Sequence, residues 1–411
     1  MGFYSGTFAT TINPAELNKR SFASAMLRLY PNGVSPIFAL TSQTGRSKAV
    51  ASTHGYFTKT LTFATAYINA GAGYAAGITT FVVDNGSGAA APDLQAGQVL
   101  YSIRTREIFR VVTVTGGGTG ITVATRPFGR VAAAALVDND QFIVIGTAFE
   151  EGSSRPSARG LTTTYVANYT QIFRNAWAVT DTARASLTEM GFTNIAESRA
   201  DAALLHSADI EAAIIFGQPK MDTTTPNAPL HATQGIIDAV TQYAPANIYT
   251  EAGGSTTYSE LINAFEVAFA FAHDMGESTM RMCFAGATAM KVFNQIARLN
   301  GTIQILQGQT SFGMRYQEFL FYKGTVILME HPILNGLAGQ SGTAIVVDMP
   351  ALKIAYMDGR DTKVEEYGGS GKNNANGVDA VGGSFTTEMA VELLNPGGCA
   401  VLYSLAVGAA G

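Results

Sequence analysis

A polar, extended stretch, residues 148 to 186, constrains the fold of this chain more than any other feature of its sequence. The stretch is rich in Thr, Arg and Asn, and its few large apolar residues include Tyr165, Tyr169, Phe173 and Trp177. An isolated two-stranded ribbon is only marginally stable in water, so a hairpin of this composition cannot bury itself. The sequence therefore predicts an arm that gains its burial by lying on other molecules.

One strongly marked helix follows the arm. Asn194 and Glu197 form an N-cap with a capping-box partner, and apolar residues then recur at helical spacing as far as Gly217. Pro219 prevents continuation of the helix. At about 1.5 Å per residue, the predicted helix is roughly 33 Å long.

A different pattern fills residues 58 to 147. Short runs in which apolar and polar residues alternate are broken by glycine-containing turns at residues 84 to 86 and 116 to 118. Alternation with a period of two is typical of strands. The pattern predicts a small all-β domain, a barrel or a sandwich, over residues 62 to 147. Arm-like sequence lies on both sides, so we expect this domain to be an insertion within the arm.

The second half of the chain combines helices and strands. Thr257 and Glu260 form another capping box, which begins a helix expected to run to Gly276, and a second helix is predicted over residues 287 to 299. Several strands are predicted between residues 302 and 328.

The C-terminal part returns to strands. Residues 352 to 357 and 362 to 367 flank the dipeptide Asp358-Gly359, which favours a hairpin. Residues 385 to 393 alternate strictly, and the turn at residues 395 to 398 is expected to bring the chain back as a further strand.

Bulk composition limits the class of protein. Hydrophobic residues make up 47% of the chain and charged residues 14%, so we expect partners to cover much of the surface. The net charge of -5 argues against a specific nucleic-acid reader. Cys283 and Cys399 lie in apolar runs and are interpreted as reduced core residues of a protein folded in the cytosol. Neither an export signal nor an apolar run long enough to cross a membrane is visible.

No constellation of residues predicts catalysis, a cofactor or a metal. The five histidines are scattered, and none has the spacing of a paired metal site. The glycine-rich run at residues 116 to 120 leads into a strand, whereas a phosphate-binding loop leads into a helix. We therefore expect no enzyme activity and no bound cofactor.

A charged cluster on the arm is the first candidate interaction site. Glu150 and Glu151 lie close in sequence to Arg155 and Arg159. These side chains either keep a solvated ribbon soluble or form ion pairs with a neighbouring subunit, which would orient the arm. Each such rim pair would contribute only about 0.2 to 1 kcal/mol.

Three aromatic residues of the arm are the second candidate. Tyr169, Phe173 and Trp177 are expected to anchor the arm on a neighbour and to contribute more than the charged pairs.

Two short sequences connect this arrangement to a known family. Asn-Tyr-Thr-Gln-Ile-Phe occupies residues 168 to 173 in the arm, and Asp-Ile-Glu occupies residues 209 to 211 in the helix. With a two-stranded arm directly before a long helix, they resemble the major capsid proteins of tailed bacteriophages, which have the Hong Kong 97-like fold. The resemblance implies an α+β chain of five parts: an N-terminal arm (1 to 45), an extended arm or E-loop (46 to 61 and 148 to 185), the inserted β domain (62 to 147), a peripheral domain with a long spine helix (186 to 236 and 348 to 411), and an axial domain (237 to 347).

The resemblance also implies a function and partners. The chain would assemble into pentamers and hexamers of an icosahedral shell, the virion capsid, around double-stranded DNA that it contacts non-specifically. Assembly in the host bacterial cytoplasm with a portal and a separate scaffolding protein is expected, and a cement protein is a further candidate partner. The initiator methionine and the lack of a charged, coiled-coil-like leading segment favour the separate scaffold.

Two other classes stay open at this level. A secreted or surface-layer β-rich structural protein would share the Gly, Thr and Ala content, but would need an export signal. A cytosolic enzyme with a barrel insertion would need convergent polar residues.

Overall fold

The computed structural model describes residues 35–59, 64–86, 92–123, 126–156, 158, 160–185, 194–225, 227–270, 279–300, 305–311, 314–367 and 380–406. The chain forms two compact units. Phe57–Tyr165 makes up the smaller unit, and the chain on both sides of it makes up the larger one.

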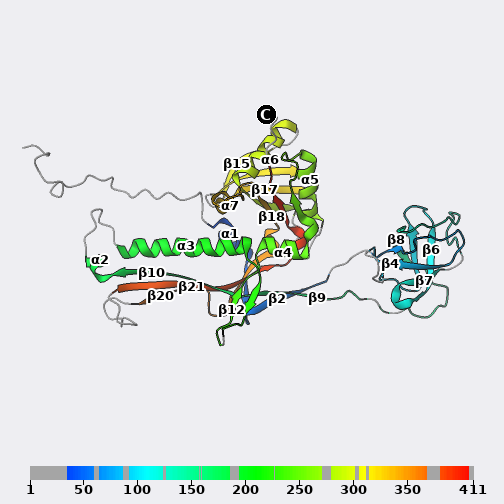
Figure 1. The fold of residues 1–411 in the computed structure, drawn as a ribbon, viewed down its shortest axis with the longest axis horizontal. Coiled ribbons are helices and arrows are strands. Elements are labelled where there is room, and N and C mark those ends of the chain that lie inside the picture. The colour runs from blue at the N-terminus through cyan, green and yellow to red at the C-terminus, as the bar shows by residue number, and fades with distance from the viewer. Residues whose placement is uncertain are drawn as a thin grey trace, which may run out of the picture. The chain divides into compact units, whose positions relative to one another are not determined.

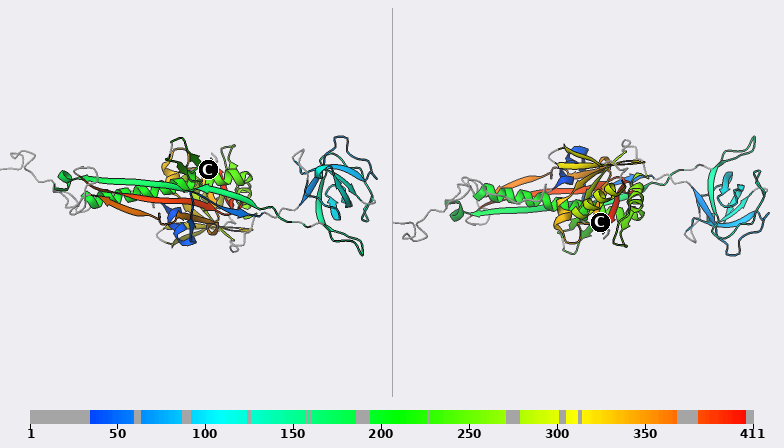
Figure 2. Two further views of the ribbon diagram at one scale, coloured as in Figure 1. Left: turned by 90° about the horizontal axis from the view of Figure 1, so that it is seen from below. Right: turned by 90° about the horizontal axis from the view of Figure 1, so that it is seen from above.

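A five-stranded sheet in the larger unit is built around one long strand, β21 (Ala380–Leu393). β10 (Gln171–Thr180) pairs antiparallel with β21 over its whole length. Helix α3 (Asn194–Phe216) lies along these two strands, as Figure 1 and both views of Figure 2 show. This is the predicted long helix, and it ends one residue before Gly217. A side chain at Gly217 would come within 2.5 Å of the carbonyl oxygens of Ala213 and Thr233.

The opposite edge of β21 carries two strands in succession. β19 (Leu352–Met357) pairs antiparallel with the C-terminal end of β21, and β20 (Lys363–Tyr367) pairs antiparallel with its N-terminal half. They therefore run in the same direction, and the predicted hairpin between them is wrong. The turn at Gly359 returns the chain to the same edge, because β21 offers enough backbone partners for both strands. β1 (Arg46–Ala49) pairs parallel with β19 and completes the sheet.

A seven-stranded sheet forms the second layer of the larger unit, in the order β13-β22-β18-β14-β17-β16-β15. The turn at residues 395 to 398 was expected to return the chain beside β21. Instead the chain enters this second sheet, where β22 lies between β13 and β18. The strands are β13 (Ile248–Thr250), β14 (Met280–Ala285), β15 (Ile305–Ser311), β16 (Met314–Phe321), β17 (Gly324–Glu330), β18 (Ala344–Val347) and β22 (Ala400–Tyr403).

Two amphipathic helices build a core with this sheet. α5 (Tyr258–Glu266) begins with the predicted capping box, in which Glu260 accepts from the backbone N–H of Thr257 at 2.8 Å. A single 3-10 turn extends it to Phe269; the rest of the expected helix lies outside the described residues. α6 (Ala287–Asn300) matches the second predicted helix.

Shorter elements complete the described chain. Two pairs of strands stand apart from the larger sheets: the ribbon of β2 with β9, and the antiparallel pair of β11 with β12. The elements are α1 (Pro36–Thr44), β2 (Thr53–Thr58), β9 (Thr164–Tyr169), α2 (Asp181–Ala185), β11 (Lys220–Asp222), β12 (Leu230–Ala232), α4 (Ile236–Tyr243) and α7 (Pro332–Gly336).

The smaller unit contains a closed six-stranded barrel in the order β3-β4-β7-β6-β5-β8. Of the two predicted forms of the inserted domain, the barrel is therefore the correct one. Phe109 lies between Phe81 and Phe142 in its interior, with ring centroids 5.8 and 5.2 Å away. The strands are β3 (Thr65–Ile68), β4 (Thr80–Asp84), β5 (Gln98–Ser102), β6 (Ile108–Thr115), β7 (Gly120–Val123) and β8 (Gln141–Thr147).

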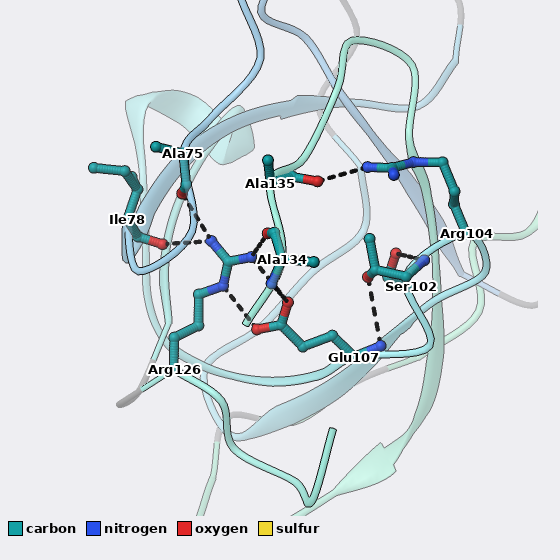
Figure 3. Close-up of polar contacts among 9 residues, drawn as sticks. Ala75, Ile78, Ser102, Arg104, Glu107, Arg126, Ala134 and Ala135 are labelled. Carbon is teal, nitrogen blue, oxygen red and sulfur yellow. Dashed lines mark hydrogen bonds and ion pairs between the residues drawn. The ribbon is translucent and has the colours of Figure 1, made fainter. Parts of the chain in front are cut away.

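A buried ion pair holds the long segment between β7 and β8 to the barrel (Figure 3). The guanidinium of Arg126 donates to both carboxylate oxygens of Glu107, at 2.8 and 2.9 Å, and both side chains are buried. Arg126 also donates to the carbonyl oxygens of Ile78 and Ala134. The pair therefore joins three segments of the chain, and its donors and acceptors satisfy each other.

Candidate assembly surfaces

Two of the predicted interface anchors lie inside the subunit. Phe173 belongs to the main core of the larger unit, and Trp177, which is 5% exposed, packs with Ala202 of α3 and Phe385 of β21. The expectation that these two side chains contact a neighbour is therefore wrong. β10 is a half-buried strand of the subunit's own sheet, and its inward face is already covered by α3.

Two adjacent glycines of β21 make room for aromatic rings on opposite faces of the sheet. A side chain at Gly383 would meet the ring of Trp177 at 3.1 Å, and one at Gly382 would meet the hydroxyl of Tyr367 at 2.6 Å. The two rings sandwich the strand at this point. The glycines are therefore required by close packing.

A chain of hydrogen bonds links α3 to the sheet beneath it. The imidazole Nδ1 of His206 is 2.7 Å from the Oδ1 atom of Asn175, whose amide nitrogen donates to Asp209. Because Asn175 Oδ1 can only accept, Nδ1 carries the proton, and Nε2 accepts from the hydroxyl of Thr387 at 2.8 Å. Burial lowers the pKa of His206, while the nearby carboxylate of Asp209 acts in the opposite direction. The neutral form of His206 thus suits this position.

The motif at residues 168 to 173 forms the corner between the ribbon and β10. The side chain of Asn168 is buried and donates to the backbone oxygens of Gln234 and Val391, while its Oδ1 atom accepts from the N–H of Gln234 at 2.7 Å. Thr170 donates to Glu388 of β21 at 3.0 Å. Sequence reasoning missed this structural role. The signal was a short polar run between two alternating segments.

Tyr169, the third predicted anchor, is half-buried. Its ring stacks on His231 of β12, with centroids 5.9 Å apart. Because it is only half-buried, Tyr169 stays a candidate contact.

The ribbon of β2 and β9 presents large exposed apolar side chains. Phe57 is 72% exposed and Tyr165 is 49% exposed, and their ring centroids lie 5.0 Å apart. Val50, before β2, is 82% exposed. Solvent exposure of paired aromatic rings is costly unless a partner covers them, which makes the ribbon the strongest candidate surface for assembly.

The charged cluster is only partly available to a neighbour. Glu150 pairs with Arg110 of its own barrel, with 3.1 Å between the charged atoms. Glu151 and Arg155 are exposed, and neither makes an ion pair with any described residue. Arg159 lies outside the described residues.

Among the described residues no group of three His, Cys, Asp or Glu side chains is placed to hold a metal ion. In the same part of the chain, no helix combines the length and apolarity required to cross a bilayer. Cys283 and Cys399 are both buried thiols, and burial raises the pKa of Cys399 to about 12.

The chain was compared with known protein families, and the model of the SU10 major capsid protein matches residues 5–406. The chain belongs to this family. Within the SU10 major capsid protein family it is similar to the "Major capsid protein" of Pseudomonas phage PaMx41, at 47% identity over 98% of this chain and 97% of the relative. The family match gives no support to the surface-layer alternative.

Solved structures of phage proteins resemble this chain at low sequence identity. The capsid structure of cyanophage P-SCSP1u matches with a TM-score of 0.50 and 10% identity, over 95% of this chain and 94% of the cyanophage chain. A structure from Microbacterium phage Oxtober96 matches with a TM-score of 0.47 and 10% identity, over 94% and 96% of the two chains. The Hong Kong 97-like α+β fold implied by the sequence resemblance is confirmed.

Proposed function

We propose that this chain is the major capsid subunit of a tailed phage. Copies of it assemble as pentamers and hexamers into an icosahedral shell, the virion capsid, which encloses double-stranded DNA. The observation that carries the proposal is the family match over residues 5–406. This family is a structural one, which supports the expectation that the chain is not an enzyme.

The physical support comes from the ribbon of β2 and β9. A shell repeats one heterologous contact around local axes, so each subunit must present a surface that a different surface of its neighbour covers. The exposed ring pair of Phe57 and Tyr165 is such a surface. Each contact can be weak, on the order of 4 kcal/mol, because every subunit makes several and misplaced copies can then dissociate.

The division into domains is part of the proposal. The five-stranded sheet with α3 corresponds to the peripheral domain (186 to 236 and 348 to 411), except that its strands β1 and β10 fall in the ranges expected for the extended arm. The seven-stranded sheet with α5 and α6 corresponds to the axial domain (237 to 347). Residues 400 to 403 have to be moved to the axial domain, because β22 is a strand of its sheet.

The remaining partners are inferred from the shell. A separate scaffolding protein sets the curvature, a portal occupies one vertex, and a cement protein is a candidate stabiliser. A net charge of -5 fits a container that contacts DNA non-specifically without binding it tightly. Two reduced, buried cysteines fit assembly in the host bacterial cytoplasm.

Negative-stain microscopy of the purified protein, alone and with its scaffolding protein, tests the proposal. We expect shells or capsomer rings from the unchanged chain. We also expect them from the control variant Val112→Ser, which removes an exposed apolar side chain from the outer face of the barrel. The double variant Phe57→Ser and Tyr165→Ser should stay soluble and give no closed shells. Dispersed particles from the unchanged chain, together with catalytic turnover, would overturn the proposal.

A further inference from the structure

Helix α3 places one carboxylate, that of Glu211, inside the core of the larger unit. Its Oε1 atom accepts from the backbone N–H of Ile37 at 2.8 Å, and its Oε2 atom accepts from the N–H of Phe38 at 2.8 Å. The Nε2 atom of His331 lies 2.7 Å from Oε1. Glu211 and His331 are both completely buried.

The two backbone donors belong to the first turn of α1. The first N–H groups of a helix have no partner within the helix, and a nearby side chain usually accepts from them. Ser35, at the N-cap position, makes no such bond. Glu211, which is 174 residues away from Ile37 in sequence, accepts from these N–H groups instead. A carboxylate also interacts favourably with the positive end of the helix dipole.

His331 joins this carboxylate to a third element. Because a carboxylate only accepts, Nε2 of His331 carries the proton. The ring lies edge-on to Phe284 of β14, and the backbone N–H of His331 donates to Ala285 at 2.9 Å. The position of His331 is therefore fixed by the seven-stranded sheet, just before α7. The contacts of Glu211 thus form only when three elements are correctly positioned relative to one another: α1, α3 and the junction between β17 and α7.

We propose that Glu211 anchors a releasable strap, α1, whose docking depends on the position of α3 relative to the seven-stranded sheet. One residue of helix rise is about 1.5 Å, so a shift of α3 by less than a turn removes the carboxylate from the two amide donors. Only the apolar packing of Ile37, Phe38 and Leu40 then holds the start of α1 on the core. A movement of α3 is in this way converted into release of the first turn of α1.

Hydrogen–deuterium exchange on the dispersed full-length subunit tests this coupling independently of shell formation. In Glu211→Gln the single amide oxygen cannot serve both backbone donors and His331. We expect amide exchange in α1 to become at least ten times faster, while exchange in β14 stays unchanged. The control Asp209→Asn makes the same change of charge two residues earlier on α3, and it should leave α1 as protected as in the unchanged chain.

A second pair of variants decides the matter if Glu211→Gln does not fold. His331→Leu removes the donor, and His331→Gln restores an N–H that can reach the carboxylate. We expect faster exchange in α1 for the leucine variant and recovery for the glutamine variant. Wild-type protection of α1 in folded Glu211→Gln would overturn the proposal. Equal loss of protection in α1 and β14 in every Glu211 and His331 variant would overturn it as well.

Discussion

Trp177 packs α3 onto the five-stranded sheet, so its replacement should lower the free energy of unfolding. Truncating a buried aromatic side chain leaves a cavity, and we expect Trp177→Ala to lower the free energy of unfolding by about 3 to 5 kcal/mol. Ile172, on the opposite face of the same strand, is 51% exposed. Ile172→Ala should change the free energy of unfolding by no more than about 0.5 kcal/mol. Thermal unfolding of the dispersed subunit measures both. Equal shifts in Tm would show that β10 is not packed as described.

The burial of Phe173 and Trp177 reverses an expectation drawn from the sequence, which was that both side chains anchor the arm on a neighbouring subunit. Their spacing, with Val179 two residues later, does predict one face of a strand. The sequence could not show which surface covers that face, because the partner strand β21 begins about 200 residues later and the pairing depends on tertiary contacts.

His206 should make stability depend on pH. Burial lowers its folded-state pKa below the ordinary value of 6.5, so the unfolded chain binds more protons between the two values. The stabilising contribution is complete above pH 6.5 and is lost as the pH falls from there through the folded-state pKa. We expect the drop in Tm between pH 7.5 and about pH 5.5 to be smaller in His206→Gln than in the unchanged subunit. An identical drop in both proteins would contradict this role.

At the scale of elements, the ion pair of Glu107 and Arg126 should control the stability of the barrel. Removing one partner of a buried pair leaves an uncompensated charge, and we expect Arg126→Met to destabilise the barrel by about 3 to 5 kcal/mol. The double variant Glu107→Leu and Arg126→Met should recover most of that loss. Glu150, which pairs with Arg110 but is 77% exposed, is the matched control, and Glu150→Gln should cost much less. Amide exchange in β6 and β7 reports each change.

Elements with strong local signals were predicted well, and strand partners were not. α3 and α6 lie where they were expected because the apolar spacing of a helix is local. The turn at Asp358 was correctly found, but the hairpin was wrong because β21 offers a longer partner for both flanking strands. β22 was misplaced because its partners, β13 and β18, are distant in sequence and belong to the other sheet. Among the site residues, Glu150 could not be assigned from sequence, because its partner Arg110 lies 40 residues away on strand β6 of the barrel.

At the scale of the whole molecule, each compact unit has its own core, and the barrel should be dispensable for folding of the larger unit. Joining Thr58 to Thr164 by a short glycine linker should leave exchange in α3 and β21 unchanged, because their core contains no barrel residue. If the barrel contributes to the shell, particles assembled from this variant should disassemble at a lower temperature. Loss of protection in α3 would show that the two units do not fold separately.

A density map of the assembled shell by electron cryo-microscopy tests the central claim most directly, because it shows which surfaces of the subunit are covered by neighbours. We predict closed shells in which the ring pair of Phe57 and Tyr165 is buried against an adjacent subunit, while Trp177 stays packed on its own α3. A map in which the ribbon of β2 and β9 faces solvent at every subunit, or the absence of closed particles under assembly conditions, would contradict the account.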